Sequence, residues 1–270
     1  MSECEKIPCK LSVVIPCYNE RGTIREIVER VGQAPVAELE IIVVDNLSTD
    51  GTRDILREEI EPKVARVIYN ERNIGKSGSV IKGIAAATGD AVIVQDADLE
   101  YDPVEGYPAL LGPIVRGEAD VVYGSRFKTG AGPRGATANY VANRLLTRLS
   151  NLTTGWRLTD METCYKMFRR EVIQAIELRE GGFGFEPEVT AKLARAGVRV
   201  AEVPISYDPR TSEEGKKVGF ADGVHSVCCI LRYGPRTRAL ALGALAAAGA
   251  AVLAARVVPR AARGIARPWR

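Results

Sequence analysis

Short apolar runs alternate with segments of helical periodicity from Leu11 to Phe127, and this alternation strongly constrains the fold. The apolar runs are Leu11–Pro16, Glu40–Asp45, Ala65–Tyr69, Ala91–Gln95 and Val121–Tyr123. Runs of this length are typical of strands buried on both faces, and their alternation with helices is typical of parallel β-α-β units. The sequence therefore predicts an α/β fold built on a doubly wound, mostly parallel sheet.

The segments between and after these runs carry the helical pattern. In Glu20–Val31, the apolar residues recur at the spacing that places them on one face of a helix. Further helices are predicted over Asp50–Ile60, Lys76–Ala87, Asn139–Leu152, Phe185–Ala196 and Ala221–Tyr233, and a late strand over Arg199–Val203. Lys128–Ala138 is rich in glycine and Ile205–Val218 is polar, so both are predicted to be loops.

The chain has 270 residues, of which 46% are hydrophobic and 26% charged, as expected for one large domain with an appendage. The predicted organisation is a tail over residues 1–10, an α/β domain over 11–218, a juxtamembrane amphipathic helix over 219–238, an apolar helix over 239–255 and a basic tail over 256–270. The first ten residues lack an apolar core, so no signal peptide is predicted.

The spacing of the cysteines and the histidine content argue against several classes of site. The six cysteines are Cys4, Cys9, Cys17, Cys164, Cys228 and Cys229, and none has zinc-ligand spacing to a second pair. The chain is also too long for a small disulfide scaffold, so free thiols in a reducing compartment are predicted. His225 is the single histidine and is predicted to be structural, so a histidine-based triad is disfavoured.

The stretch Ala239–Ala255 is uncharged and is flanked by arginines. Its length lies at the lower limit for crossing a bilayer, and its alanine content makes insertion weak. A membrane-dipping or single spanning helix is predicted, with a helix packed on the protein or on a partner as the alternative. From Arg256 onward the chain has five arginines and no acid, which suits an anionic surface of membrane or nucleic acid, or a solvated end.

Two carboxylates, Asp96 and Asp98, follow the apolar run that ends at Gln95. Ligands of open α/β sheets bind at the carboxyl ends of strands, and paired carboxylates there suit a hard divalent cation that also contacts phosphate oxygens. The stretches Pro16–Glu20, Asp45–Thr52 and Asn70–Gly78 follow other predicted strands, so they are expected to converge on the same crevice. The carboxylates, amides and hydroxyls of these stretches, together with Lys76, are groups that can bind a nucleoside diphosphate.

Two common nucleotide motifs are absent from the sequence. There is no G-x-x-x-x-G-K-[ST] phosphate loop, and no G-x-G-x-x-G follows the first predicted strand. A P-loop nucleotidase and a dinucleotide dehydrogenase are therefore disfavoured.

Five further motifs follow one another along the chain, namely SVVIPCYNE, EIIVVDNLSTDGT, NIGKSGSVIKGIAAATGD, QDADLEYDP and VVYGSRF. In their order they resemble the motifs of family 2 glycosyltransferases of the GT-A fold, which bind nucleotide sugars on a Rossmann-like domain. Within that family the chain is similar to polyprenyl-phosphate glycosyltransferases of the dolichol-phosphate mannosyltransferase type, through TDMETCYKMFRREV, FGFEPEVTAKLARAG and VPISYDPRTSEEGKKVG. The resemblance extends from about Leu11 to Tyr233.

The resemblance implies roles for specific residues. Asp96 and Asp98 would hold Mg²⁺ or Mn²⁺ on the diphosphate of the donor. The nucleotide sugar would be bound by Pro16, Tyr18, Asn19, Glu20, Asp45, Asn46, Lys76, Asp96 and Ala97. The catalytic residues would be Asp98, Arg126, Arg210 and Lys217, with Arg126 facing the phosphates or the acceptor and the last two in a late loop that closes over them.

The chain departs from the family pattern at two places. Asn46 and Leu47 stand where the family usually has a second aspartate and a glycine, which leaves the donor nucleotide open. The arginine usually found in the helix after the glycine-rich loop could be Arg144 or Arg148.

The expected reaction is transfer of a hexose to dolichyl or undecaprenyl phosphate with inversion at the anomeric carbon. The preferred sugar is mannose, with GDP-mannose as the donor. A lipid phosphate is already anionic, so it needs no strong general base, whereas a hydroxyl acceptor would need one, for which Asp160 and Glu186 are candidates. Alternatives are another donor such as UDP-glucose, a saccharide or protein hydroxyl as acceptor, a nucleotidyltransferase and a non-catalytic scaffold.

The expected partners follow from a lipid acceptor. The substrate phosphate lies at the bilayer surface, so the apolar and basic carboxyl-terminal segments would bind the membrane lipid surface, and no nucleic acid is expected. Nucleotide sugars are cytosolic, so the expected location is the cytoplasmic face of a membrane. Whether the chain forms a homo-oligomer is left open.

Overall fold

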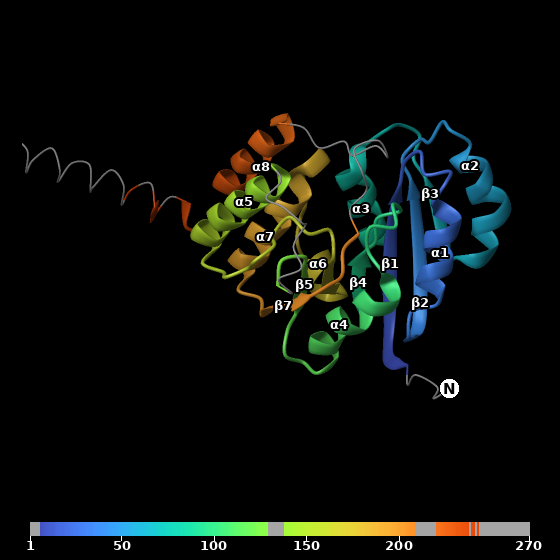
Figure 1. The fold of residues 1–270 in the computed structure, drawn as a ribbon, viewed down its shortest axis with the longest axis horizontal. Helices are drawn as coiled ribbons and strands as arrows, with labels where there is room; N and C mark the ends of the chain where they lie inside the picture. The colour runs from blue at the N-terminus through green and yellow to red at the C-terminus, as the bar shows by residue number, and fades with distance from the viewer. Residues whose placement is uncertain (1–5, 129–137, 209–219, 238, 241, 243–270) are drawn as a thin grey trace, which may run out of the picture.

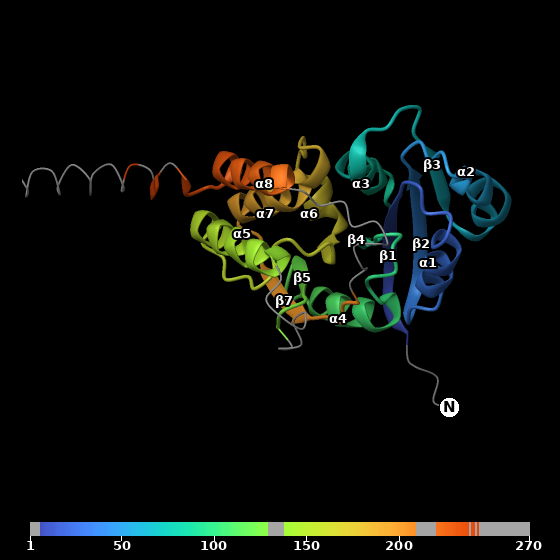
Figure 2. The same ribbon diagram turned by 45° about the horizontal axis from the view of Figure 1, so that its top comes forward.

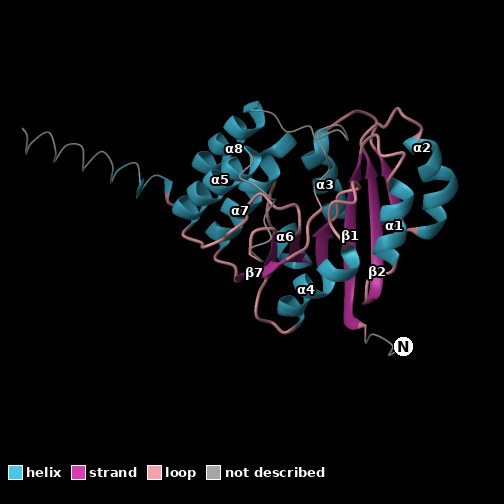
Figure 3. Cartoon of the chain, viewed as in Figure 1, coloured by secondary structure: helices cyan, strands magenta, loops and turns pink. Residues whose placement is uncertain are grey.

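One sheet runs through the computed structural model, which describes residues 6–128, 138–208, 220–237, 239, 240 and 242. Its seven described strands lie in the order β3-β2-β1-β4-β6-β5-β7 (Figures 1 and 3). They are β1 (Ile7–Cys17), β2 (Val36–Asp45), β3 (Arg66–Tyr69), β4 (Ala91–Val94), β5 (Val121–Ser125), β6 (Lys166–Arg169) and β7 (Val200–Pro204). The predicted α/β architecture is confirmed.

The sheet is mostly parallel, with one exception that the sequence analysis did not predict. β6 runs antiparallel to both β4 and β5, while the other neighbouring pairs are parallel. β6 is short and carries Lys166 and Arg169 at its ends, so its periodicity did not mark it as a strand. β1 also begins at Ile7, ahead of the strand predicted over Leu11–Pro16.

Helices cover both faces of the sheet. They are α1 (Ile24–Gly32), α2 (Thr52–Ile55), α3 (Gly75–Ala86), α4 (Pro103–Val115), α5 (Ala138–Thr154), α6 (Arg170–Gln174), α7 (Phe185–Ala196) and α8 (Phe220–Tyr233). A π-helical turn over Leu56–Ile60 and a 3₁₀ turn over Glu61–Lys63 extend α2, so the helix predicted over Asp50–Ile60 is observed. A second 3₁₀ turn, Gly182–Gly184, precedes α7.

Alternation along β1 divides the core into two layers. Leu11, Val13 and Ile15 pack with the apolar faces of α1 and α4, whereas Val14 packs with α3 and α7 on the other face. Successive side chains of a strand point to opposite faces, so a strand buried on both sides reads as a continuous apolar run. Figure 2 shows α5, α7 and α8 grouped beside β5 and β7, away from α1 and α2.

The helix α4 was not predicted, because Pro108 and Pro113 lie inside it and break the usual helical signals. Its start is nevertheless well specified. Asp102 caps it by accepting a hydrogen bond from the Val104 amide at 2.8 Å, and Pro103 occupies the first helical position, where no amide hydrogen is needed.

The carboxyl-terminal predictions are tested only in part. The helix predicted over Ala221–Tyr233 is observed as α8. Of the apolar segment Ala239–Ala255, only residues 239, 240 and 242 are described, and no helix among the described residues is long and apolar enough to cross a membrane. Cys9, Cys17, Cys164, Cys228 and Cys229 are free thiols, as predicted, and Cys4 lies outside the described residues.

Close packing of α3 on β1 depends on Gly83. A Cβ at this position would overlap Cγ1 of Val14, which is fully buried. We therefore predict that Gly83→Ala lowers the free energy of unfolding by about 1–3 kcal/mol, as overpacking does. Gly32→Ala is the matched control, because a Cβ there has no neighbour within 4 Å. Urea denaturation of both variants tests this, and equal stability of the two would contradict it.

Candidate functional site

The carboxyl ends of the central strands meet at one edge of the sheet. Cys17 at the end of β1 pairs with Asp45 at the end of β2, and Asp45 pairs with Tyr69 at the end of β3. β4 joins the same parallel set, with Val14 opposite Val94. The loops that follow these strands therefore converge, as predicted from their positions in the sequence.

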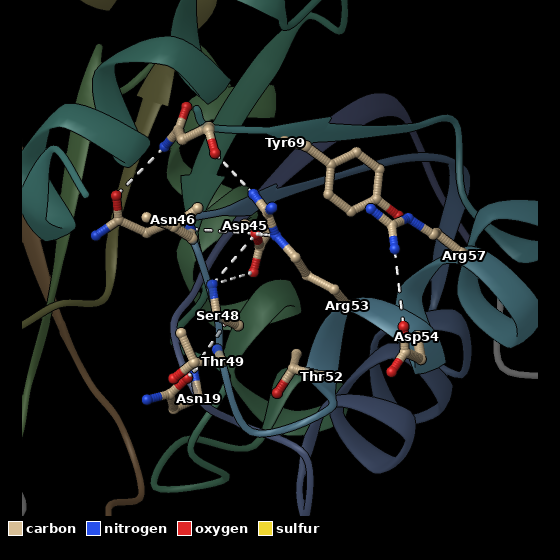
Figure 4. A network of polar contacts seen from close by, with 12 residues as sticks. Asn19, Asp45, Asn46, Ser48, Thr49, Thr52, Arg53, Asp54, Arg57 and Tyr69 are labelled. Carbon is tan, nitrogen blue, oxygen red and sulfur yellow. Dashed lines mark hydrogen bonds and ion pairs between the residues drawn. The ribbon is translucent and has the colours of Figure 1, made fainter. Parts of the chain in front are cut away.

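Hydrogen bonds join the loops after β1 and β2 (Figure 4). The Asn19 amide donates to Ser48 Oγ at 2.9 Å, and Asn19 Oδ1 accepts from the Thr49 amide at 2.8 Å. The Glu20 amide donates to Thr52 Oγ1 at 3.0 Å. Pro16 lies within β1 beside Val44, and the Tyr18 side chain is exposed next to these loops. Their expected contacts with a nucleotide stay predictions.

Asp45 organises the β2 loop from inside the protein. It is fully buried and accepts hydrogen bonds from the amides of Leu47 and Ser48, at 3.1 and 3.2 Å. The Arg53 guanidinium donates to it at 2.5 Å and to the Asn70 carbonyl at 2.7 Å (Figure 4). Asp45 thus holds the β2 and β3 loops together through a buried charge pair.

Asn46 explains one departure from the family pattern. It is buried, its Nδ2 donates to Asn73 Oδ1 at 2.8 Å, and its Oδ1 accepts from the Ile74 amide at 2.8 Å. An aspartate could accept from Ile74 but could not donate to Asn73. The amide is therefore used to hold the loop that leads into α3.

Leu47, the other departure, has a φ of 66°, in the left-handed region that favours glycine. A side chain there costs about 1–2 kcal/mol. A glycine, the usual family residue at this position, would avoid this cost.

Lys76, Asp96 and Asp98 form the charged centre of the site. Lys76 Nζ lies 2.7 Å from Asp96 Oδ1 and 2.9 Å from Oδ2, and 3.2 Å from Cys164 Sγ. Burial favours the neutral acid, but the charge of Lys76 outweighs it and lowers the pKa of Asp96. Burial, with the negative charges of Asp96 and Glu100, raises the pKa of Asp98 to about 7.

These side chains fit a hard divalent cation. Asp96 and Asp98 offer oxygen ligands from one short loop, with buried Ala97 between them. Burial and the negative charge of Asp96 raise the pKa of Asp98, so ionised Asp98 lacks a compensating positive charge, which Lys76 supplies only in part. The residues present therefore fit the predicted Mg²⁺ or Mn²⁺ site.

Arg126 is held beside this centre by Asp160. Its Nε and Nη2 donate to the two carboxylate oxygens at 2.7 and 2.8 Å, and its backbone amide donates to the same group. The guanidinium also lies over the ring of Tyr207, 5.2 Å from its centroid. Asp160 is fully buried and both of its oxygens accept from Arg126, so it positions Arg126 and is poorly placed to act as a base.

Arg144 and Arg148 of α5 differ in their contacts and in their exposure. Arg144 Nη1 donates to the Thr159 carbonyl at 3.1 Å, and its guanidinium lies 5.9 Å from the ring centroid of Phe127. Arg148 is exposed on the helix. Arg144 is therefore the α5 arginine that lies beside Arg126. Arg210 and Lys217 lie outside the described residues.

Glu162 is a candidate that the sequence analysis missed. Its Oε1 is buried and has no hydrogen-bond partner among the described residues. Burial and the charge of Glu186 raise the pKa of Glu162 to about 8. Buried polar atoms without a partner are rare in native proteins, so this oxygen is available to a ligand. Its place in TDMETCYK, two residues from Asp160, was the available signal.

Two surface hollows differ in their relation to this site. A small pocket at the site is lined by Lys76, Ser77, Val80, Val94, Cys164, Gly182, Phe185 and Glu186. A larger hollow, about 350 Å³, is lined by Pro8, Cys9, Asp90, Ile114, Val115, Arg169, Arg170 and Glu171. The larger one lies at the opposite ends of the strands and mixes both signs of charge, so we assign the site to the smaller pocket.

Breaking the Arg126–Asp160 pair tests its structural role. We predict that Asp160→Asn lowers the free energy of unfolding by about 3 kcal/mol, because it leaves a largely buried guanidinium without its charge partner. The Arg116–Glu118 pair is exposed, so Glu118→Gln should leave stability unchanged. Urea denaturation measures both. A stable Asp160→Asn variant would instead favour a reactive carboxylate at this position.

Known proteins resemble the chain over most of its length. Residues 12–177 match the family described as glycosyl transferase family 2. An undecaprenyl-phosphate mannosyltransferase of Micrococcus luteus is 31% identical over 242 residues, covering 85% of this chain and 96% of the relative. A dolichol-phosphate mannosyltransferase of Pyrococcus furiosus is 33% identical over 218 residues, covering 78% of this chain and 60% of the relative.

Solved structures show the same fold. A glucosyl-3-phosphoglycerate synthase of Mycobacterium tuberculosis, in complex with Mn²⁺, UDP-glucose and phosphoglyceric acid, has a TM-score of 0.62 at 23% identity, over 83% of this chain and 79% of that one. The phosphoglyceric acid complex of the same enzyme gives a TM-score of 0.61 at 24% identity, over 84% and 80%. From the matched residues and the described site, the chain belongs to glycosyl transferase family 2 and is a glycosyltransferase.

Proposed function

We propose that this glycosyltransferase transfers a hexose from a nucleotide sugar to a polyprenyl phosphate, with inversion at the anomeric carbon. The observation that carries the proposal is the cluster of Lys76, Asp96 and Asp98 at the edge where the β1, β2 and β3 loops converge. The names of the Micrococcus and Pyrococcus relatives support the acceptor and make mannose the first sugar to test.

Asp96 and Asp98 would hold Mg²⁺ or Mn²⁺ on the donor diphosphate. The bound ion would supply positive charge to the departing nucleoside diphosphate. Lys76 occupies both oxygens of Asp96 in this structure, and a second cation beside Asp96 would repel it. Lys76 would then be free to contact a phosphate oxygen of the donor.

Arg126 and Arg144 suit an anionic acceptor. Arg126 is fixed in orientation by Asp160, and Arg144 lies against Phe127 on the same side. Positively charged groups of fixed orientation would hold a lipid phosphate near the donor against the repulsion of its diphosphate. An ionised phosphate oxygen attacks without a general base. This agrees with the structure of the site, because both oxygens of Asp160 accept hydrogen bonds from Arg126 and Asp160 is then not needed as a base.

A hydroxyl acceptor is the second candidate, and Glu162 is the observation that favours it. Its unpartnered buried oxygen could receive a proton from a sugar or protein hydroxyl.

The identity of the donor nucleotide sugar is a separate question. The Mycobacterium neighbours were solved with Mn²⁺ and UDP-glucose, and Asn46 replaces an expected aspartate, so UDP-glucose is the second donor to test.

Apolar side chains on α5 and α8 support action at a lipid surface. Val141, Leu145 and Leu152 are exposed along one stripe of α5, and Val224 and Leu231 along one stripe of α8. The two helices pack together and lie side by side in Figures 1 and 2. Amphipathic helices of this kind bind the headgroup boundary without crossing it. We place the site at the cytoplasmic face, where nucleotide sugars are available.

A transfer assay tests the proposed reaction. The full chain is incubated with Mg²⁺ or Mn²⁺, a labelled nucleotide sugar and polyprenyl phosphate, and the lipid is extracted. We expect label in the lipid fraction with GDP-mannose or UDP-glucose. Label only in a water-soluble or protein product would favour the hydroxyl acceptor, and no transfer with any common donor would refute both.

Removal of a carboxylate tests the cation site. We predict that Asp98→Ala lowers turnover by at least about 100-fold with the fold intact, because charge on the leaving group is no longer offset. Calorimetry should also show that Mn²⁺ no longer strengthens binding of the nucleoside diphosphate. Asp54→Ala is the control, since that side chain is exposed on α2. Full activity of the Asp98 variant would remove the assignment.

Negative charge introduced on the exposed apolar stripe of α5 tests whether this stripe binds a lipid surface. We predict that Leu145→Glu with Leu152→Glu lowers kcat/KM by about tenfold for a long-chain acceptor in anionic vesicles, because two charges must approach the apolar boundary. Transfer to a short, water-soluble acceptor phosphate should not change. Val115→Glu, an exposed position on α4, is the control. An equal loss with both acceptors, or with the control, would contradict this placement.

A further inference from the structure

We propose that Glu180, His225 and Cys229 form a site for a thiophilic divalent cation of the Zn²⁺ class, separate from Asp96 and Asp98. One carboxylate oxygen, one imidazole nitrogen and the sulfur all lie within 4.8 Å of one another. His225 Nε2 is 3.2 Å from Glu180 Oε2. This inference is independent of the proposed acceptor and donor.

The ligands come from two elements that the fold brings together. His225 and Cys229 are four residues apart on α8, so both point from the same side of the helix. Glu180 lies in the segment between α6 and the Gly182–Gly184 turn. A pair at this helical spacing, with a third ligand from another segment, is a common arrangement for a transition-metal ion.

Gly184 leaves the space in which these groups meet. A Cβ at Gly184 would lie 2.7 Å from Glu180 Cβ, 3.0 Å from His225 Cε1 and 3.3 Å from Cys229 Sγ. All three neighbours belong to the proposed ligand residues. Only a glycine allows the three side chains to approach from these directions.

The geometry and chemistry suit zinc more than magnesium. Bonds of about 2.0–2.3 Å in a tetrahedral site place ligand atoms about 3.3–3.7 Å apart. The 3.2 Å between His225 Nε2 and Glu180 Oε2 is close to this range, and the Cys229 sulfur lies within 4.8 Å of both atoms. A sulfur ligand selects against Mg²⁺ and Mn²⁺. Binding would replace the Cys229 thiol proton, which passes to solvent.

Access to the site is also adequate. The His225 side chain is 42% exposed, which leaves room for a water molecule as fourth ligand. Arg232 and Tyr233 contact Glu180 from the carboxyl end of α8. The Arg232 side chain is 70% exposed, so it can turn into solvent when a cation binds.

A bound ion would join α8 to the active-site wall. The Gly182 carbonyl accepts from Ser77 Oγ at 2.5 Å, and Gly182 lines the small pocket with Lys76 and Glu186. A cation at Glu180 therefore ties the helix with the exposed apolar stripe to the turn beside that pocket.

The test is a Cd²⁺ or Co²⁺ titration of the full chain with excess Mg²⁺ present to occupy oxygen-only sites. We expect thiolate-to-metal absorption that saturates at one equivalent. Cys229→Ser should abolish the absorption, and His225→Ala should weaken binding by about tenfold or more. Cys228→Ser is the matched control, because this neighbouring thiol is exposed and should not contribute.

X-ray absorption of the Zn²⁺-loaded wild-type chain keeps the test valid if a variant misfolds. One sulfur with nitrogen and oxygen ligands is expected. Absorption that survives Cys229→Ser, absorption that is lost with Cys228→Ser, or a zinc shell without sulfur would each overturn the proposal.

Discussion

Parallel pairing of β1 with β2 and β4 is the constraint on which the rest of this structure depends. Parallel strands end at the same edge, so the loops after Cys17, Asp45 and Val94 meet although they are far apart in the sequence. The apolar faces of α1 and α3 hold this arrangement from both sides. The polar groups of the site can therefore be loop residues, because buried strands fix where each loop begins.

The acids of the site differ in how firmly each is held by its positively charged partner. Asp45 and Asp160 are fully buried and use their oxygens to hold Arg53 and Arg126, so both acids shape the site. Among the described residues, Asp96 forms its ion pair with Lys76, whose side chain is one-third exposed and can therefore turn away. The proposed cation site is thus where a charge can be exchanged at the lowest cost in stability.

Much of the fold could be predicted because buried parallel strands have a plain sequence pattern. The helix α4 could not, since Pro108 and Pro113 hide it, and β6 is too short for its periodicity to be visible. In the site, the convergence of Lys76 and Asp96 follows from strand order. The choice between Arg144 and Arg148, and the unpartnered oxygen of Glu162, depend on side-chain packing that no local pattern encodes.

The most direct test of the account is the position of Mn²⁺ in crystals grown with a nucleoside diphosphate, located by anomalous scattering. The account predicts one manganese ion bound by Asp96 and Asp98 and the diphosphate, with Lys76 displaced from Asp96. Manganese bound elsewhere, or a diphosphate bound with the Lys76–Asp96 pair intact and no metal at Asp98, would contradict it.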